Sequence, residues 1–266
     1  MSLDPYAREE VSARHYLHAL NPLAKIVAVL PVMVVIVFTR DVLTPLVLVG
    51  LAYLVLLTGV RLTRRRAAIL FLALPLLGGI LSLGFGLWTD PARVDHSVEL
   101  FRVGGYRFYA DAWRVGLATA LRLVAIVSLA LISGMSSTGP DLVRSAVQHA
   151  RVPYRIGYAA LASYRFVPRF RHELEVIRKA HRVRGSAGGR GPVAALNRGV
   201  RSIIPLLASA IRHAERVSLS MESRAFGAHE TRTERYLVPL RTRDGVFVVV
   251  LWLCAAALVL GVRFFA

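Results

Sequence analysis

Five apolar blocks constrain the fold of this chain more than any other feature of its sequence. They are residues 26–39, 42–60, 67–88, 112–135 and 246–262. A helix needs about 20 apolar residues to cross the ~30 Å hydrocarbon core of a bilayer. The three middle blocks meet this length, the last is at the short limit, and the first meets it only if its helix begins before Lys25 or includes Pro22. We therefore predict an all-α, polytopic membrane protein with about five transmembrane helices.

The basic residues lie mainly on one of the two sides that these blocks define. Of the 34 Lys and Arg residues, 20 lie in the polar segment 136–244, three precede the first block, four lie between the second and third, and five lie on the opposite side. Loops rich in Lys and Arg stay cytoplasmic. We expect the N-terminus and residues 136–244 to be cytoplasmic and the C-terminus to be external.

This sidedness also accounts for the net charge of +18. A strongly basic chain can bind nucleic acid, but here the positive charges follow the membrane topology. We interpret them as topology signals that also attract anionic membrane lipid, and we expect no nucleic acid partner.

Three patterns that carry chemistry in other proteins are incomplete in this one. The glycine-rich stretch SAGGRGP at 186–192 lacks the Lys-Ser or Lys-Thr of a phosphate-binding loop. The stretch HELEV at 172–176 places Val176 where a zinc protease motif needs its second histidine. A single cysteine, Cys254, excludes a thiolate metal site. We expect no catalytic residues, no metal site and no cofactor.

The polar segment 136–244 should hold the function, because it is too long for a simple loop between two spans. Thr138, Pro140 and Asp141 form a helix-start pattern, which predicts a short helix to about residue 150.

Two long amphipathic helices are predicted next, over residues 154–184 and 193–226, with apolar residues at every third or fourth position. We expect them to cross or pair and to bury their apolar stripes, with a bend at Pro168 and a bend or interruption near Pro205. The predicted division is a transmembrane bundle over 1–135, a cytoplasmic helical domain over 136–244 and a last span over 245–266.

Both long helices end in an arginine beside small residues. The first ends with Val183, Arg184 and Gly185, and the second with Ser223, Arg224 and Ala225. A small residue lets another backbone approach, and a guanidinium offers a planar set of donors to carboxylates or carbonyls. Two such ends suit docking to two similar surfaces on partner proteins. Alternatively, Gly185 only terminates a helix and Arg184 only interacts favourably with the helix dipole.

Arg122 lies near the middle of the fourth apolar block. A charge there costs ~3 kcal/mol or more unless it is paired or hydrated. Arg122 is therefore a candidate intramembrane functional residue, and pairing with Asp90 or Asp111, or extension to the membrane interface, is the structural alternative.

The order of these features resembles the transmembrane T component of energy-coupling factor (ECF) importers, the EcfT/CbiQ family. The resemblance is carried by NPLAKI at 21–26, SSTGPDLVRSAVQHARVPYR at 136–155, AHRVRG at 180–185 and MESRAFG at 221–227. It covers nearly the whole chain.

The resemblance implies a scaffold without catalytic activity in the plasma membrane of a prokaryote. Its partners would be two ABC ATPase subunits and one membrane-embedded S component, which selects the vitamin or transition-metal ion to be imported. The family's two Ala-Arg-Gly signatures insert into grooves on the ATPases, which implies this role for Arg184 and Arg224. The chain departs from the signatures at Val183, Ser223 and Ala225.

A polytopic membrane enzyme and a self-sufficient permease are the alternatives from other classes. Each needs polar groups that converge inside the membrane bundle. Besides Arg114 and Arg122, the apolar blocks contain mainly scattered Ser and Thr, so we favour the scaffold.

Overall fold

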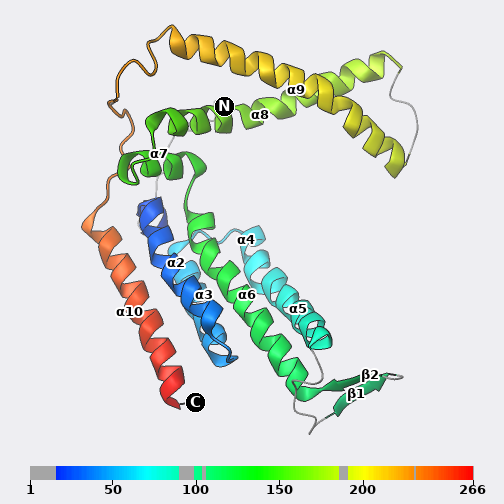
Figure 1. The fold of residues 1–266 in the computed structure, drawn as a ribbon, viewed down its shortest axis with the longest axis vertical. Coiled ribbons are helices and arrows are strands. Elements are labelled where there is room, and N and C mark those ends of the chain that lie inside the picture. The colour runs from blue at the N-terminus through cyan, green and yellow to red at the C-terminus, as the bar shows by residue number, and fades with distance from the viewer. Residues whose placement is uncertain (1–15, 90–98, 104–105, 186–190, 231, 266) are drawn as a thin grey trace. The chain divides into compact units, whose positions relative to one another are not determined.

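The computed structural model describes residues 16–89, 99–103, 106–185, 191–230 and 232–265 (Figure 1). Its helices are α1 (Tyr16–Ala19), α2 (Pro22–Phe38), α3 (Leu43–Gly59), α4 (Arg64–Ala68), the π-helical stretch η1 (Ile69–Ala73), α5 (Leu74–Trp88), α6 (Ala110–Ser136), α7 (Gly139–His149), α8 (Tyr154–Val183), α9 (Pro192–Glu222) and α10 (Thr242–Phe265). Strands β1 (Glu99–Val103) and β2 (Tyr106–Tyr109) form a short antiparallel ribbon that the apolar pattern did not indicate. The predicted all-α class is confirmed.

The helices form two compact units, and the first contains the membrane-spanning helices. This unit is the chain up to Leu142 together with the chain from Val238 onward, and the second unit is Val143–Leu237. The continuous helix Arg64–Trp88 has 25 residues, α6 has 27 and the apolar stretch of α10 has 23. Helices α2 and α3 have 17 residues each, at the lower end of the ~17–25 that span a bilayer. The part of the chain that the structure describes thus has five apolar helices, as predicted.

Capping residues, and not only apolar composition, set the ends of the first and last spans. Asn21 caps α2, because its side-chain oxygen accepts a 2.9 Å hydrogen bond from the backbone N–H two residues on. The helix therefore begins ahead of Lys25, which gives the first span the length it needed. In α10, the Asp244 carboxylate accepts a 2.7 Å hydrogen bond from the backbone N–H of Arg241. This span begins in polar sequence and is longer than its apolar block predicted.

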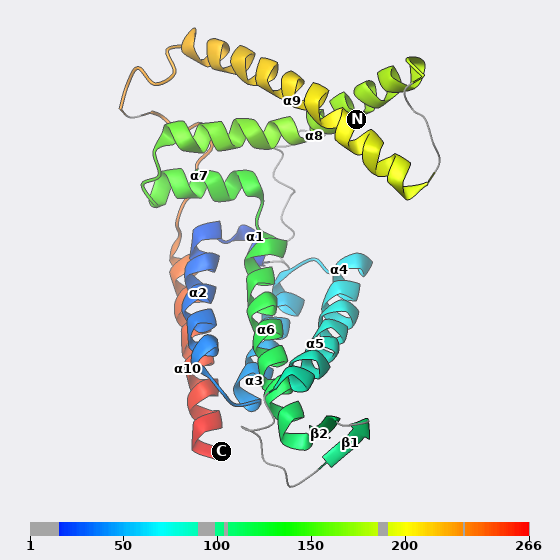
Figure 2. The ribbon, with the colours of Figure 1, turned by 45° about the vertical axis from the view of Figure 1, so that its right-hand side comes forward.

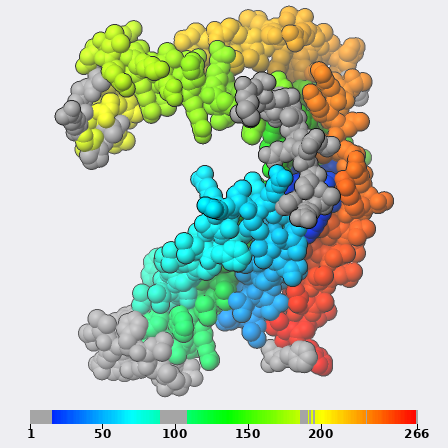
Figure 3. Space-filling model, turned by 180° about the vertical axis from the view of Figure 1, so that it is seen from behind, coloured from blue at the N-terminus to red at the C-terminus, as the bar shows by residue number. Residues whose placement is uncertain are grey.

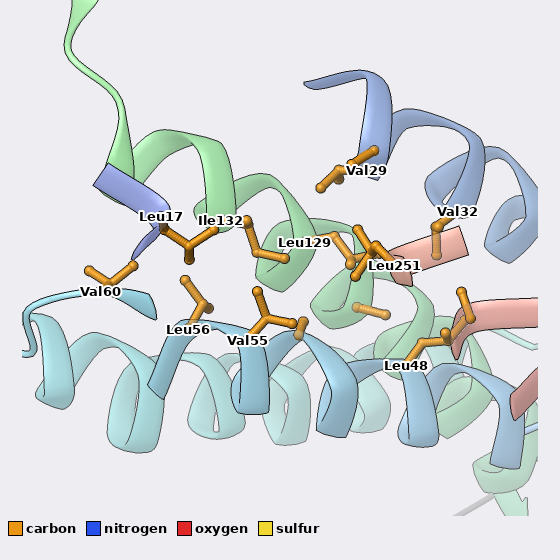
Figure 4. Packing of buried hydrophobic residues seen from close by; sticks show 14 of the residues in the cluster. Leu17, Val29, Val32, Leu48, Val55, Leu56, Val60, Leu129, Ile132 and Leu251 are labelled. Carbon is orange, nitrogen blue, oxygen red and sulfur yellow. The ribbon is translucent and has the colours of Figure 1, made fainter. Parts of the chain in front are cut away.

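Helix α6 is the centre of the first unit. It packs against α2, α3 and α5, and α10 packs against α2 and α3. Figure 4 shows Leu129 and Ile132 of α6 facing Val55 and Leu56 of α3. Many large apolar side chains on the outside of the unit stay exposed, including Trp88 at 90%. A large apolar exterior of this kind is favourable in the hydrocarbon core of a bilayer and is rare in proteins that are surrounded by water.

Small residues allow α5 and α6 to pack with their backbones in contact. A Cβ on Gly116 would lie 2.4 Å from the carbonyl oxygen of Ser82 and 2.5 Å from the backbone nitrogen of Gly86. Transmembrane helices pair closely through such small residues, because lipid offers no hydrophobic driving force between them. Among the described glycines, Gly116 marks the closest approach of one helix backbone to another.

The second unit consists mainly of two long helices that cross. Helix α8 has 30 residues and α9 has 31, and both views of the ribbon show them crossing (Figure 1 and Figure 2). Both helices continue through their internal prolines, so the predicted interruption near Pro205 does not occur. At the crossing, the Phe166 ring stacks on the His213 ring, with 4.4 Å between the ring centroids.

The predicted burial of the apolar stripes of these helices is wrong within this chain. On α9, Ile203, Leu207 and Ile211 are each more than half exposed. Two helices that cross touch over a short length, so much of the apolar face of α9 lies outside the contact.

Candidate functional site

The end of α8 has the geometry of a left-handed helix cap. Arg184 follows the last helical residue, and its backbone N–H donates to the Ala180 carbonyl at 3.1 Å. Gly185 then has φ +69°. This left-handed backbone costs an L-residue about 1–2 kcal/mol but costs glycine little. The chain therefore leaves the helix axis directly after Arg184.

The end of α9 has a similar left-handed cap, built around an alanine, although Ser223 and not Arg224 directly follows the last helical residue. Ala225 has φ +55°, and it follows Arg224 as Gly185 follows Arg184. The Phe226 N–H donates to the Met221 carbonyl at 3.0 Å, which closes the cap as in a Schellman motif. The two arginines thus occupy equivalent positions, each just before a left-handed residue. The sequence indicated the paired arginines but not the left-handed backbone of Ala225, because alanine rarely adopts a positive φ.

Both helix ends are exposed. Val183 is 89% exposed, and Arg184, Ser223, Arg224 and Ala225 are exposed as well. In the described part of the chain, the guanidinium groups of Arg184 and Arg224 make no hydrogen bond and no ion pair. Their donors are available to an external acceptor.

The two arginine ends lie at opposite ends of the crossed pair (Figure 2), and Figure 3 shows the same separation from behind. The end of α9 lies beside the start of α8, because the Phe226 and Tyr154 ring centroids are 5.6 Å apart. Helix α8 has 30 residues and is therefore about 45 Å long at 1.5 Å per residue. The separation of the two ends is of this order.

A group of side chains that we call the clip holds the end of α9 against the start of α8. Its members are Tyr154, Arg155, Tyr158, Phe226, Arg232 and Glu234. Arg155 donates to the Gly227 carbonyl at 2.7 Å, and Tyr154 donates to the His229 carbonyl at 2.6 Å. The sequence analysis did not predict the clip. The four-residue spacing of Tyr154 and Tyr158, which puts both on one helix face, was the available signal.

The remaining clip contacts involve Tyr158. Its hydroxyl donates to the Glu234 carboxylate at 3.0 Å, and the Arg232 guanidinium lies 4.4 Å from its ring centroid. Burial, assisted by Glu234, raises the pKa of Tyr158 above its usual value. Tyr158 therefore stays protonated and remains a hydrogen-bond donor throughout the physiological pH range.

Arg122 lies in the first unit and contacts the end of α2. Its guanidinium donates to the backbone carbonyl of Thr39, the residue that caps α2. A cation at a helix C-terminus satisfies an open carbonyl and interacts favourably with the helix dipole. Of the predicted alternatives, Asp90 lies outside the described residues. A functional role for Arg122 stays a prediction.

A buried polar junction in the first unit was not predicted as such. Lys25 is 0% exposed, and its ammonium donates to the Leu17 carbonyl and to both oxygens of Ser136 at 2.9–3.1 Å. The backbone N–H of Asn21 donates to the Asp244 carboxylate at 2.8 Å. The sequence motif NPLAKI therefore ties the start of α2 to α1, α6 and α10, whereas we had counted Lys25 only as a topology signal.

Fold and site together define a class: a multi-pass, all-α membrane protein with a separate helical unit that presents two exposed arginine ends. Comparison with known proteins gives the particular family. The family model CbiQ, described as a cobalt transport protein, matches residues 13–234. The chain belongs to this family, which confirms the resemblance inferred from its sequence.

Curated relatives share one name, "Energy-coupling factor transporter transmembrane protein EcfT". The relative from Lactococcus lactis is 26% identical over 260 residues, which cover 92% of each chain. The relative from Streptococcus equi is 26% identical over 248 residues, or 88% of this chain and 87% of its own length. The relative from Exiguobacterium sibiricum is 29% identical over 161 residues, but these cover only 57% of this chain and 61% of that protein.

Proposed function

We propose that this chain is the transmembrane scaffold subunit of an energy-coupling factor importer. It joins two ABC ATPase subunits to a separate, membrane-embedded S component and has no catalytic activity of its own. The S component binds the substrate, a vitamin or a transition-metal ion. Membership of the CbiQ family and the name of the relatives support this proposal.

The observation that carries the proposal is the pair of equivalent helix ends. Each presents an exposed arginine immediately before a left-handed residue, at Gly185 and at Ala225. Two equivalent ends suit two similar partner surfaces, and a separation of about 45 Å along α8 suits two separate subunits. Val183–Arg184–Gly185 and Ser223–Arg224–Ala225 are the proposed docking ends, with the arginine as donor to partner carboxylates or carbonyls.

The departures from the Ala-Arg-Gly signature are compatible with this role. Val183 and Ser223 precede the arginines. Neither has a positive φ, so the backbone does not require glycine at these two positions. Ala225 reaches the left-handed conformation that glycine adopts at Gly185. The cap geometry that presents each arginine is therefore retained.

We further propose the membrane orientation that the arginine distribution supports. The N-terminus and residues 136–244 lie in the prokaryotic cytoplasm, and the C-terminus is external. Residues 1–135 and 245–266 act as the membrane part, and residues 136–244 act as the coupling part that meets the ATPases.

The double variant Arg184→Glu, Arg224→Glu tests the docking role. Each charge-assisted hydrogen bond contributes about 1.5–3 kcal/mol, so losing both should weaken ATPase binding by about 100-fold or more. The measurement is the amount of ATPase that co-purifies with the tagged chain from its host in mild detergent. We expect the double variant to be folded and to retain almost none.

A matched control places the same charge change elsewhere on the same helices. Arg178 and Arg216 are exposed residues of α8 and α9 away from the ends, and Arg178→Glu, Arg216→Glu should retain the ATPases. Unchanged co-purification with the end variant, or equal loss with the control, contradicts the proposal.

A further inference from the structure

The two docking ends differ in what supports them. Around Gly185, no atom of the described residues other than its immediate neighbours lies within 4 Å of the position of a Cβ, and Val183 is 89% exposed. At the other end, two residues after Ala225, Nε of Arg155 lies 3.4 Å from the position of a Cβ on Gly227. One end projects without support from the described residues, and the other is held.

Phe226 connects the cap of α9 to the clip. Its backbone N–H closes the cap on the Met221 carbonyl. Its ring packs edge-on against the rings of Tyr154 and Tyr158, with 5.6 and 6.0 Å between the centroids. The guanidinium carbon of Arg232 lies 5.6 Å from the centroid of the same ring. Phe226 therefore both completes the left-handed cap after Arg224 and packs against α8.

Hydrogen bonds fix the chain that follows Phe226 in the same place. Arg155, Tyr154 and Tyr158 hold Gly227, His229 and Glu234 respectively. Two of these contacts come from consecutive residues of α8, and the third comes from a residue one turn further along. Together they fix both the position and the direction of the chain that follows Phe226. Gln148 of α7 adds a 2.9 Å hydrogen bond to the Tyr236 carbonyl.

A second point of attachment prevents the pair from turning about a single contact. The stack of Phe166 on His213 lies at the crossing, about 18 Å along α8 from Tyr154 at 1.5 Å per residue. Two helices joined at one point can rotate like scissors, whereas two points of attachment resist that rotation. The clip therefore sets where the end of α9 lies relative to α8.

We propose that the clip positions Arg224 for docking, with Phe226 and Arg155 as positioning residues. The inference rests on the proposed docking function. It makes the two ends unequal: contacts within the chain hold the second end against α8, whereas the first end projects beyond its own helix cap. Organisation in advance strengthens binding, because less conformational freedom is lost when the partner arrives.

A spectroscopic experiment tests the clip independently of any partner. In a Cys254→Ala background, spin labels go on cysteines that replace Lys179 and Ser220, which are exposed residues near the ends of α8 and α9. Pulsed electron spin resonance on the full chain in detergent gives the distribution of label distances. We expect a narrow distribution in this background and a much broader one in Phe226→Ala, Arg155→Ala. Tyr164→Ala, an exposed aromatic of α8 outside the clip, should leave it narrow.

A double-mutant cycle tests the positioning role. Phe226→Ala should lower the amount of co-purified ATPase several-fold in the parent chain and in Arg184→Glu, but it should add no loss to Arg224→Glu. Phe226→Tyr, which keeps the ring, should restore binding. A purely structural defect would lower binding equally in both backgrounds.

The outcomes separate the failure of this inference from failure of the proposed function. If Arg184→Glu, Arg224→Glu retains the ATPases, the docking function fails, and the label distances still report on the clip. If that variant loses the ATPases but Phe226→Ala broadens no distance, or lowers binding equally in both single-arginine backgrounds, the positioning role is overturned.

Discussion

At the scale of single residues, the positive φ of Ala225 offers a direct test of the cap. Ala225→Gly should raise stability by about 1 kcal/mol, because the left-handed backbone is costly for alanine. Gly185→Ala should lower it by a similar amount. The melting temperature in detergent and hydrogen exchange of the Phe226 amide would measure both changes.

Ala228→Gly is the control, because Ala228 is exposed and has no positive φ. It should bring no gain. A gain from Ala228→Gly equal to that from Ala225→Gly would contradict the cap geometry.

Lys25 should contribute substantially to the stability of the fold, although it lies in an apolar helix. Its ammonium has three acceptors, on Leu17 and Ser136, and hydrogen bonds from a charged group contribute about 1.5–3 kcal/mol each. Lys25→Met keeps the approximate length of the side chain but removes these three hydrogen bonds. We expect a loss of about 3 kcal/mol or more, visible as a lower melting temperature in detergent, whereas Lys179→Met at an exposed position should change little. Equal melting temperatures for the two variants would refute the role of the junction.

These residues also show which details a sequence conceals. Arg184 and Arg224 could be identified because their context repeats along the chain. The partners of Lys25 could not, since Ser136 is 111 positions away and nothing local marks it. The left-handed backbone of Ala225 was equally hidden, because residue type predicts a positive φ for glycine and not for alanine.

At the scale of helices, the contact of α5 with α6 predicts a sharp difference between two glycines of α6. Gly116→Ala would place a Cβ 2.4 Å from the Ser82 carbonyl, whereas Gly134 has no atom within 4 Å of that position. The first change forces the backbones apart and should cost about 1–3 kcal/mol. Gly134→Ala should be neutral or slightly stabilising. Thermal unfolding of both variants in detergent measures the two changes in stability. Equal changes would mean that the backbones of α5 and α6 are not in contact.

Periodicity predicted the helices better than it predicted their neighbours. The expected ends of α8 and α9 lie within a few residues of those observed, because proline, glycine and apolar spacing act locally. The predicted burial of Ile203 and Leu207 failed, because a periodic pattern identifies an apolar face but not what covers it. The contact that joins the two helices involves Phe166 and His213, which come from different helices and are not connected by any local pattern.

At the scale of the whole molecule, the proposed orientation predicts which residues are reached from outside the cell. In a Cys254→Ala background, Arg40→Cys should react with a membrane-impermeant maleimide on intact cells stripped of their wall. Lys179→Cys should react only after the membrane is opened. Both residues are exposed in the structure, so a difference in labelling reports sidedness, and the reverse pattern would invert the topology.

The membrane class could be predicted from composition because the thickness of a bilayer fixes the length of a spanning helix. The number of apolar helices followed from the same argument. The short ribbon and the clip did not, since each depends on contacts between segments that no local pattern connects.

The exposed apolar face of α9 has a consequence for how such a chain can be produced. Ile203, Ile204 and Leu207 lie on α9 and are each more than half exposed. Contiguous apolar surface of this kind drives self-association when nothing covers it. Synthesis in excess of its natural neighbours should therefore yield aggregated or degraded protein, and balanced co-expression is the rational route to material that stays monodisperse.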